Sequence, residues 1–334
     1  MEIKAIIPFR PIFSIDEESI PFPFKECYTE FIDHFPDKYH SDESEIDNLK
    51  LTIISGSDEF YEIFQRVYFA DTPFLGNSYF VIKSVATATI TMESFEPPLK
   101  NHEQLELFKK GFAAHALSQH LTEILLAAQL SYPSLINTRR GVVFIDDEIH
   151  GFIPEQGGFL IGFFEPFLKL NWLEIRSIPF KQVWEWLQKQ GVFSEYLGKT
   201  PIQRGICAFT HLHDRSSDDL SQLFWALVGL EAIFGRGRGD LRKQLAEKIQ
   251  KYLGKLKAFK NIIGKLYDYR SLFIHGDLPF RPWKALDFED AEQSRVEAES
   301  SKFSSIACSI LTATLQKMVI EDRDSLEFEL KIVE

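Results

Sequence analysis

The pattern of hydrophobic and polar positions changes once along the chain, near residue 200. Before that point, short apolar or alternating runs bounded by turn residues predict β-strands. These runs cover residues 3–9, 49–57, 78–94 and parts of 140–172. Residues 103–130 and 180–190 instead repeat apolar positions every three or four residues, which predicts helices. The acidic and polar segment 35–48 shows neither period, and we expect a surface loop there.

Residues 1–197 are therefore predicted to form one mixed α+β domain, with a sensory or regulatory role. Asp146, Asp147 and Glu148 lie between two apolar runs and predict a hairpin turn. Gly191 is expected to close the helix at 180–190. We find no phosphate-binding loop, nucleotide fingerprint or metal-ligand spacing in this part of the sequence.

Residues 198–334 have helical periodicity almost throughout. Capping residues mark the helix starts, at Thr200 with Pro201, at Ser216 to Asp219, and at Asp240. Four or five helices with short links, the last from about residue 287 to 320, are typical of an up-and-down bundle. The predicted fold class is thus an α+β N-terminal domain followed by an all-α C-terminal helical bundle.

Composition places the chain among ordinary globular proteins. It has 334 residues, of which 45% are hydrophobic and 26% charged. It has no run of about 18 uncharged apolar residues, so we expect no membrane span. Arg10 and two prolines interrupt the N-terminal stretch that a signal peptide would need. Three widely spaced cysteines predict neither a disulfide framework nor a Cys-based zinc site, and we expect a reducing, cytoplasmic location.

Charge is distributed unevenly. The net charge of −12 arises entirely within the first 200 residues, which hold 17 basic and 29 acidic residues. Residues 201–334 hold 20 of each. Within residues 236–270, 11 basic residues accompany three acidic ones, a local charge of +8. Such a basic stripe suits a polyanion, although Lys-rich helices are more often simply solvated faces.

The end of this stripe contains the strongest candidate chemistry. Residues 256–277 have an apolar stripe of helical spacing, and Gly276 is a natural helix stop. Arg270 offers a planar set of donors that suits a phosphate, and His275 can give or take a proton near neutral pH. Five residues of ideal helix turn through about 500°, which puts the two side chains roughly 140° apart. A joint site would therefore need the last turn to loosen, or a second copy of the helix.

Residues 218–277 resemble the Apea-like branch of the HEPN superfamily. The resemblance rests on LVGLEAIFG at 227–235, on the helix DLRKQLAEKIQKYLG, and above all on LYDYRSLFIHGD at 266–277. An Arg, four residues, a His and then a Gly form that branch's motif. The resemblance covers about the last 135 residues and does not extend to 1–195.

The resemblance implies a dimerising helical bundle with metal-independent endoribonuclease activity, often in antiviral-defence or toxin systems. Arg270 and His275 would be the catalytic pair. Ser271 occupies a position where many relatives have Asn. Asp277 stands where many HEPN nucleases have Tyr, and an acid there repels phosphate. Some members of the superfamily are interaction modules without activity, so membership alone does not establish an enzyme.

The implied reaction is cleavage of RNA by its own 2′-hydroxyl, with His275 moving the proton and Arg270 holding the phosphate. Two histidines of a dimer would serve as base and acid. No cofactor or metal is expected. Tyr267 or Tyr269 would either stack on a base or pack in the core. The residues expected to attract the RNA backbone are Arg236, Arg238, Lys257, Lys260 and Lys265.

Two readings of the chain stay open at this point. The first is a ribonuclease effector restrained or triggered by the N-terminal domain. The second is a non-catalytic module that dimerises through its bundle and binds a regulatory ligand or protein through its N-terminal domain. Glu231 would either hydrogen-bond near Arg270 and orient it, or face solvent. A metal-dependent hydrolase is disfavoured, since no ligand set has suitable spacing.

Overall fold

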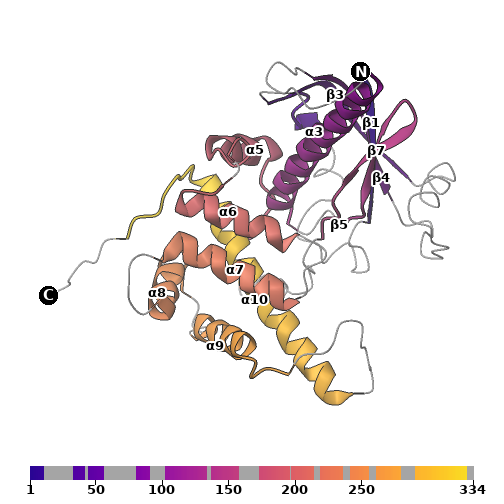
Figure 1. Ribbon diagram of the computed structural model, residues 1–334. Helices are drawn as coiled ribbons and strands as arrows, with labels where there is room; N and C mark the ends of the chain where they lie inside the picture. Colours follow the sequence, from indigo (N-terminus) through magenta and orange to yellow (C-terminus); the bar gives the residue numbers. More distant parts are fainter. Residues whose placement is uncertain are drawn as a thin grey trace. The chain divides into compact units, whose positions relative to one another are not determined.

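The computed structural model describes most of the chain as two compact units, Met1–Gly157 and Gly158–Glu334 (Figure 1). The residues it describes are 1–10, 33–41, 44–55, 80–90, 102–133, 137–157, 173–195, 197–213, 219–235, 241–255, 261–279 and 290–328. Each unit is built around its own buried core.

The first unit contains an antiparallel sheet with strand order β2-β3-β4-β1-β6-β7, in which β5 also pairs with β1. The strands are β1 (Glu2–Arg10), β2 (Tyr39–His40), β3 (Ser44–Ser55), β4 (Phe80–Ile90), β5 (Asn137–Thr138), β6 (Gly141–Ile145) and β7 (Glu148–Ile153). Asp146 and Asp147 join β6 to β7 with φ of 53° and 60°, the conformation that tight hairpins require. The predicted hairpin and the strands predicted within the described residues are therefore confirmed, whereas residues 56–57, 78–79, 91–94 and 158–172 of the predicted runs lie outside the described residues.

The prediction of a surface loop over 35–48 is wrong where two strands form. Ser44 to Asp47 begin β3 and pair with β4, and Tyr39 and His40 form the edge strand β2. Ile46 is fully buried, whereas Glu45 and Asp47 point to the opposite face of the sheet. The acidic composition concealed a two-residue alternation, because one face of this strand is polar.

A long helix, α3 (His102–Ser131), covers one face of the sheet (Figure 1). A Cβ at Gly151 of β7 would lie 3.1 Å from Cβ of Ala114, so two small residues allow close contact there. The hydroxyl of Ser118 also donates to the carbonyl of Phe152 at 2.8 Å. The helix predicted at 103–130 is thus confirmed, and its C-terminal half supplies much of the core of this unit.

The second unit is helical in its described residues. Its helices are α5 (Phe180–Lys189), α6 (Pro201–Leu212), α7 (Asp219–Phe234), α8 (Leu241–Leu253), α9 (Ile262–His275) and α10 (Ala291–Ile320). Thr200 caps α6 in a reciprocal capping box with Gln203, and Pro201 takes the first helical position, as predicted. The predicted caps at 216–218 and Asp240 lie outside the described residues.

Helix α10 is the core of this unit and contacts α5 to α9. Three of its buried hydroxyls are satisfied within the helix: Ser309, Thr312 and Thr314 each donate to the carbonyl four residues earlier. In the described part of the chain, α10 alone is long and apolar enough to cross a membrane. Of the most apolar 18-residue stretch of α10, 83% is buried inside the protein, as in a core helix.

The chain divides earlier than the predicted boundary at 197/198. The segment before α5 and α5 itself pack on the end of α10. The side-chain amide of Gln316 exchanges two hydrogen bonds with the backbone of Arg176, at 2.8 and 3.2 Å. Trp186 Nε1 donates to the carbonyl of Arg323 at 3.2 Å. These contacts join residues about 140 positions apart, so local sequence texture gave no sign of them.

Glycines bring the central helices close together. A Cβ at Gly205 of α6 would lie 2.7 Å from Cδ1 and 2.8 Å from Cγ1 of Ile233, which is buried on α7. A Cβ at Gly229 of α7 would lie 2.8 Å from Cδ2 of Leu311 on α10. Neighbouring side chains would have to shift to admit even a methyl group at either position.

Gly205→Ala should therefore lower the melting temperature of the helical unit. Overpacking costs about 1–3 kcal/mol, while the gain in helix propensity returns about 1 kcal/mol at most. Gly111→Ala in α3 is the matched control, because a Cβ there meets nothing within 4 Å. Thermal unfolding followed by circular dichroism should show a loss for the first variant and no loss for the second. Equal stability of both variants would contradict the close α6–α7 contact.

Candidate functional site

Helix α9 presents the predicted Arg270 and His275. Its buried face is formed by Ile262, Ile263 and Leu266, in agreement with the predicted stripe. Gly276 caps the helix with φ of 78°, and the N–H of Asp277 donates to the carbonyl of Leu272 at 2.8 Å. The last turn is therefore closed and stays helical through His275. Residues 256–260 of the predicted helix lie outside the described residues.

Arg270 lies on the inner side of α9, against α7. Its Nη1 donates to Oε1 of Glu231 at 2.8 Å, and each of the two side chains is 22% exposed. The guanidinium also lies over the rings of Phe224 and Tyr267, with its carbon 5.5 and 5.9 Å from the ring centroids. Its Nε is buried and donates to no acceptor in the described residues. Of the two roles considered for Glu231, the structure shows the hydrogen bond to Arg270.

Tyr267 completes this group, which we call the Glu231 cluster: Glu231, Tyr267 and Arg270. The Tyr267 hydroxyl donates to the same Oε1 of Glu231 at 2.6 Å. Burial, followed by this hydrogen bond and the charge of Glu231, raises the pKa of Tyr267 far above its ordinary range. Tyr267 is therefore a protonated donor within the protein. Its neighbour Tyr269 packs in the core, where its ring lies 4.7 Å from that of Phe303.

His275 lies on exposed surface at the last helical position of α9. Leu272 and Ile274 beside it are 43% and 51% exposed, so two large apolar side chains face solvent at this helix end. Ser271 and Asp277, both predicted to support the site, are also exposed. The end of α9 is thus an open surface that combines a histidine, two aliphatic side chains and a carboxylate.

One copy of α9 does not bring Arg270 and His275 together. Because the helix is regular between them, the two side chains project about 140° apart. Arg270 is half-buried against α7, whereas His275 faces outward. Of the two routes to a joint site expected from sequence, a loosened last turn is not observed. A second copy of the helix is the route that stays open.

The basic stripe is less available than its residue count suggests. Arg242 makes two hydrogen bonds to the carboxylate of Asp268, at 2.7 and 3.1 Å. Lys248 donates to the carbonyl of Phe234 at 2.7 Å. Lys265 is exposed and forms no ion pair within the described residues. The other predicted RNA-binding cations, Arg236, Arg238, Lys257 and Lys260, lie outside the described residues.

Phe224 is a member of this site that sequence reasoning missed. It lies seven residues before Glu231 on α7, which is two helical turns, so both side chains project from one face. This spacing was the available signal, since an aromatic ring two turns from a carboxylate can cover the cation that the carboxylate binds. Tyr267 was foreseen as an RNA contact or a core residue, and its hydrogen bond to Glu231 is a third role.

Comparison with known proteins finds no matching family model, no similar curated protein and no similar solved structure. A function must therefore be inferred from the Glu231 cluster and the exposed end of α9.

Removing the carboxylate of the Glu231 cluster should destabilise the helical unit. Loss of one partner from a fully buried pair costs about 3–5 kcal/mol, and partial exposure reduces this to about 2 kcal/mol for Glu231→Ala. The matched control is Asp268→Ala, which breaks the exposed pair with Arg242 and should cost less than about 1 kcal/mol. Chemical denaturation measures both. Equal losses would contradict a structural role for Glu231.

The contribution of Tyr267 to the free energy of unfolding should fall at alkaline pH. Its pKa is raised in the folded state, so its contribution is complete below the unfolded value of about 10 and falls as pH rises above it. The difference in unfolding free energy between wild type and Tyr267→Phe should therefore shrink between about pH 9 and 11. Tyr252, whose pKa burial also raises, is present in both proteins and cancels. A difference that stays constant over this range would refute the buried hydrogen bond.

Proposed function

We propose that the helical unit is a HEPN-type, metal-independent endoribonuclease that acts as a homodimer, in the cytoplasm, as a toxin or antiviral-defence effector. The observation that carries this proposal is that one short helix bears both a fixed guanidinium and an exposed imidazole. The Arg-x4-His motif supplies both groups, and the Glu231 cluster fixes the first of them. The fold is compatible with this proposal, because α7 and α9 pack together in a helical unit.

Arg270 would bind the scissile phosphate. A guanidinium has five donor hydrogens, and Nη1 bonded to Glu231 accounts for only part of this capacity. Nε is buried, but the side chain is 22% exposed, and donors on that exposed part would bind non-bridging phosphate oxygens. Because Glu231 and the two rings hold the side chain in place, little conformational entropy would be lost on binding. A preorganised donor of this kind stabilises charge as it accumulates on the phosphate.

His275 would move the protons. As a base, its imidazole takes the proton of the 2′-hydroxyl, whose oxygen attacks the adjacent phosphorus. The bond from phosphorus to the 5′-oxygen then breaks, and the imidazolium of His275 gives its proton to that oxygen. The products are a 2′,3′-cyclic phosphate and a 5′-hydroxyl. DNA lacks the attacking hydroxyl and should resist cleavage.

A second copy of the chain would complete the site. Since one α9 holds Arg270 and His275 on different faces, the phosphate is proposed to bind between Arg270 of one protomer and His275 of the other. Leu272 and Ile274 would become buried as the two helix ends meet. A two-fold axis near these residues would create two equivalent sites.

A non-catalytic interaction module is the second candidate, and two observations favour it. Arg270 already has a carboxylate partner, so phosphate must compete with Glu231. Asp277 lies two residues beyond His275 on the exposed helix end, where its charge repels phosphate. In this alternative, the bundle would dimerise, and the N-terminal unit would bind a regulatory protein or small ligand.

Purified protein should cleave RNA in the presence of EDTA and leave cyclic-phosphate ends. His275→Ala should lower the rate by at least about 100-fold, the usual contribution of a positioned acid or base. His102→Ala, which changes an exposed histidine at the start of α3, is the matched control and should keep full activity. Single-stranded DNA of the same sequence should stay intact.

The outcomes separate the two candidates. Cleavage by wild type and His102→Ala but not by His275→Ala supports the nuclease. If His275→Ala cleaves as fast as wild type, the activity belongs to another site or a contaminant and the proposal fails. If RNA stays intact with all three proteins although each forms a dimer, the interaction module is favoured.

A further inference from the structure

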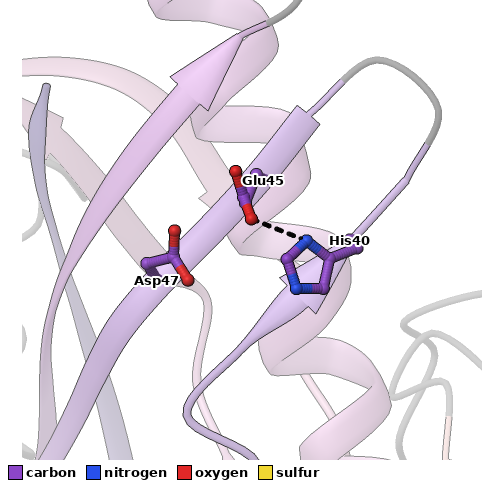
Figure 2. Close-up of side chains that lie close together, drawn as sticks. All are labelled: His40, Glu45 and Asp47. Atoms are coloured by element: carbon purple, nitrogen blue, oxygen red, sulfur yellow. Dashed lines mark ion pairs between the residues drawn. The ribbon is translucent and has the colours of Figure 1, made fainter.

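Three potential metal ligands converge on one face of the N-terminal sheet. His40 lies on the edge strand β2, directly opposite Glu45 of β3, and Asp47 follows two residues later on the same face of β3. The nitrogen and oxygen atoms that could bind an ion lie within 4.8 Å of one another. Figure 2 shows the His40 ring turned toward Glu45, with Asp47 on the same strand as Glu45.

Within the described residues, no lysine or arginine balances the charges of this group. Nδ1 of His40 lies 3.0 Å from Oε1 of Glu45, so the imidazole offsets one carboxylate when it is protonated. Asp47 is half-buried, and no lysine or arginine of the described residues forms an ion pair with it or with Glu45. A bound cation would pair with both carboxylates.

The donor set narrows the class of cation. One imidazole nitrogen with two carboxylate oxygens suits Zn²⁺, Mn²⁺, Co²⁺ or Ni²⁺, whereas Mg²⁺ and Ca²⁺ prefer oxygen ligands throughout. The side chains of His40 and Glu45 are 59% and 43% exposed, so water can reach an ion held between them. Three protein ligands and a water would complete a tetrahedral shell.

We propose that His40, Glu45 and Asp47 bind one divalent transition-metal ion at the edge of the N-terminal sheet. The ion links the two-residue strand β2 to β3. The backbone pairing between these two strands is short. The site lies in the first unit and is separate from the metal-free chemistry proposed for the helical unit. The test of one therefore does not decide the other.

Isothermal titration of the EDTA-treated, dialysed full-length protein with Zn²⁺, and with Co²⁺ for its visible absorption, tests this site. We expect one ion per chain. Loss of a supporting group around a metal costs about 10–100-fold in affinity, so loss of a ligand in His40→Ala or Asp47→Asn should cost at least about tenfold. Both changes are at sheet-edge side chains, and circular dichroism checks that the variants fold.

Glu148→Gln is the matched control. Oε2 of Glu148 lies 3.8 Å from Nε2 of His150 on β7, and in the described residues this His–carboxylate pair has no third potential ligand. Loss of the Glu148 carboxylate should therefore leave the metal affinity unchanged. Tight binding of one ion by wild type and Glu148→Gln, weakened in His40→Ala and Asp47→Asn, supports the site. Absence of stoichiometric binding to folded wild type, or equal affinity in all four proteins, overturns it.

Discussion

A single carboxylate oxygen, Oε1 of Glu231, accepts hydrogen bonds from both Tyr267 and Arg270 and so ties α7 to α9. Without it, a permanently charged guanidinium would be half-buried against Phe224 with no counter-charge in the described residues. The cost of such an unpaired charge fixes which side of α9 faces the bundle. Arg270 is thereby held on the inner side, and the opposite side of the helix end is left to His275 and its exposed neighbours.

The cap at Gly276 imposes the second constraint. Because glycine accepts a φ of 78° without steric cost, α9 can end abruptly while its last turn stays closed. A closed turn keeps Arg270 and His275 on different faces, so a single chain has the two reactive groups but not their juxtaposition. In the proposed dimer, the second protomer would pack on Leu272 and Ile274, which are exposed at the same helix end. In this proposal, the closed turn at Gly276 is the reason why the reaction needs a dimer.

Local features were predicted well from sequence. The capping pair Thr200–Pro201, the stop at Gly276 and the turn at Asp146–Asp147 each depend on the conformational preferences of a few adjacent residues. The position of the boundary between the two units was harder to predict. It depends on Gln316 holding the backbone of Arg176, a contact between residues 140 positions apart that no local pattern encodes.

The site was predictable in its members more than in its arrangement. The motif identified Arg270 and His275, and a carboxylate on the preceding helix was a natural candidate for orienting the arginine. The role of Tyr267 could not be derived, because a half-buried tyrosine at that spacing serves equally as a core or a binding residue until its partner is known. His40, Glu45 and Asp47 were overlooked, since three polar residues in an acidic segment suggest a loop unless strand pairing is known.

The central claim, that Arg270 of one protomer acts with His275 of the other, is tested most directly by complementation. Arg270→Ala and His275→Ala, each inactive alone, would be co-expressed and the mixed dimer purified by two different tags. A site shared between protomers predicts that the mixed dimer cleaves RNA, because one of its two sites keeps both groups. A mixed dimer as inactive as either parent, under conditions where wild type cleaves, would contradict the claim.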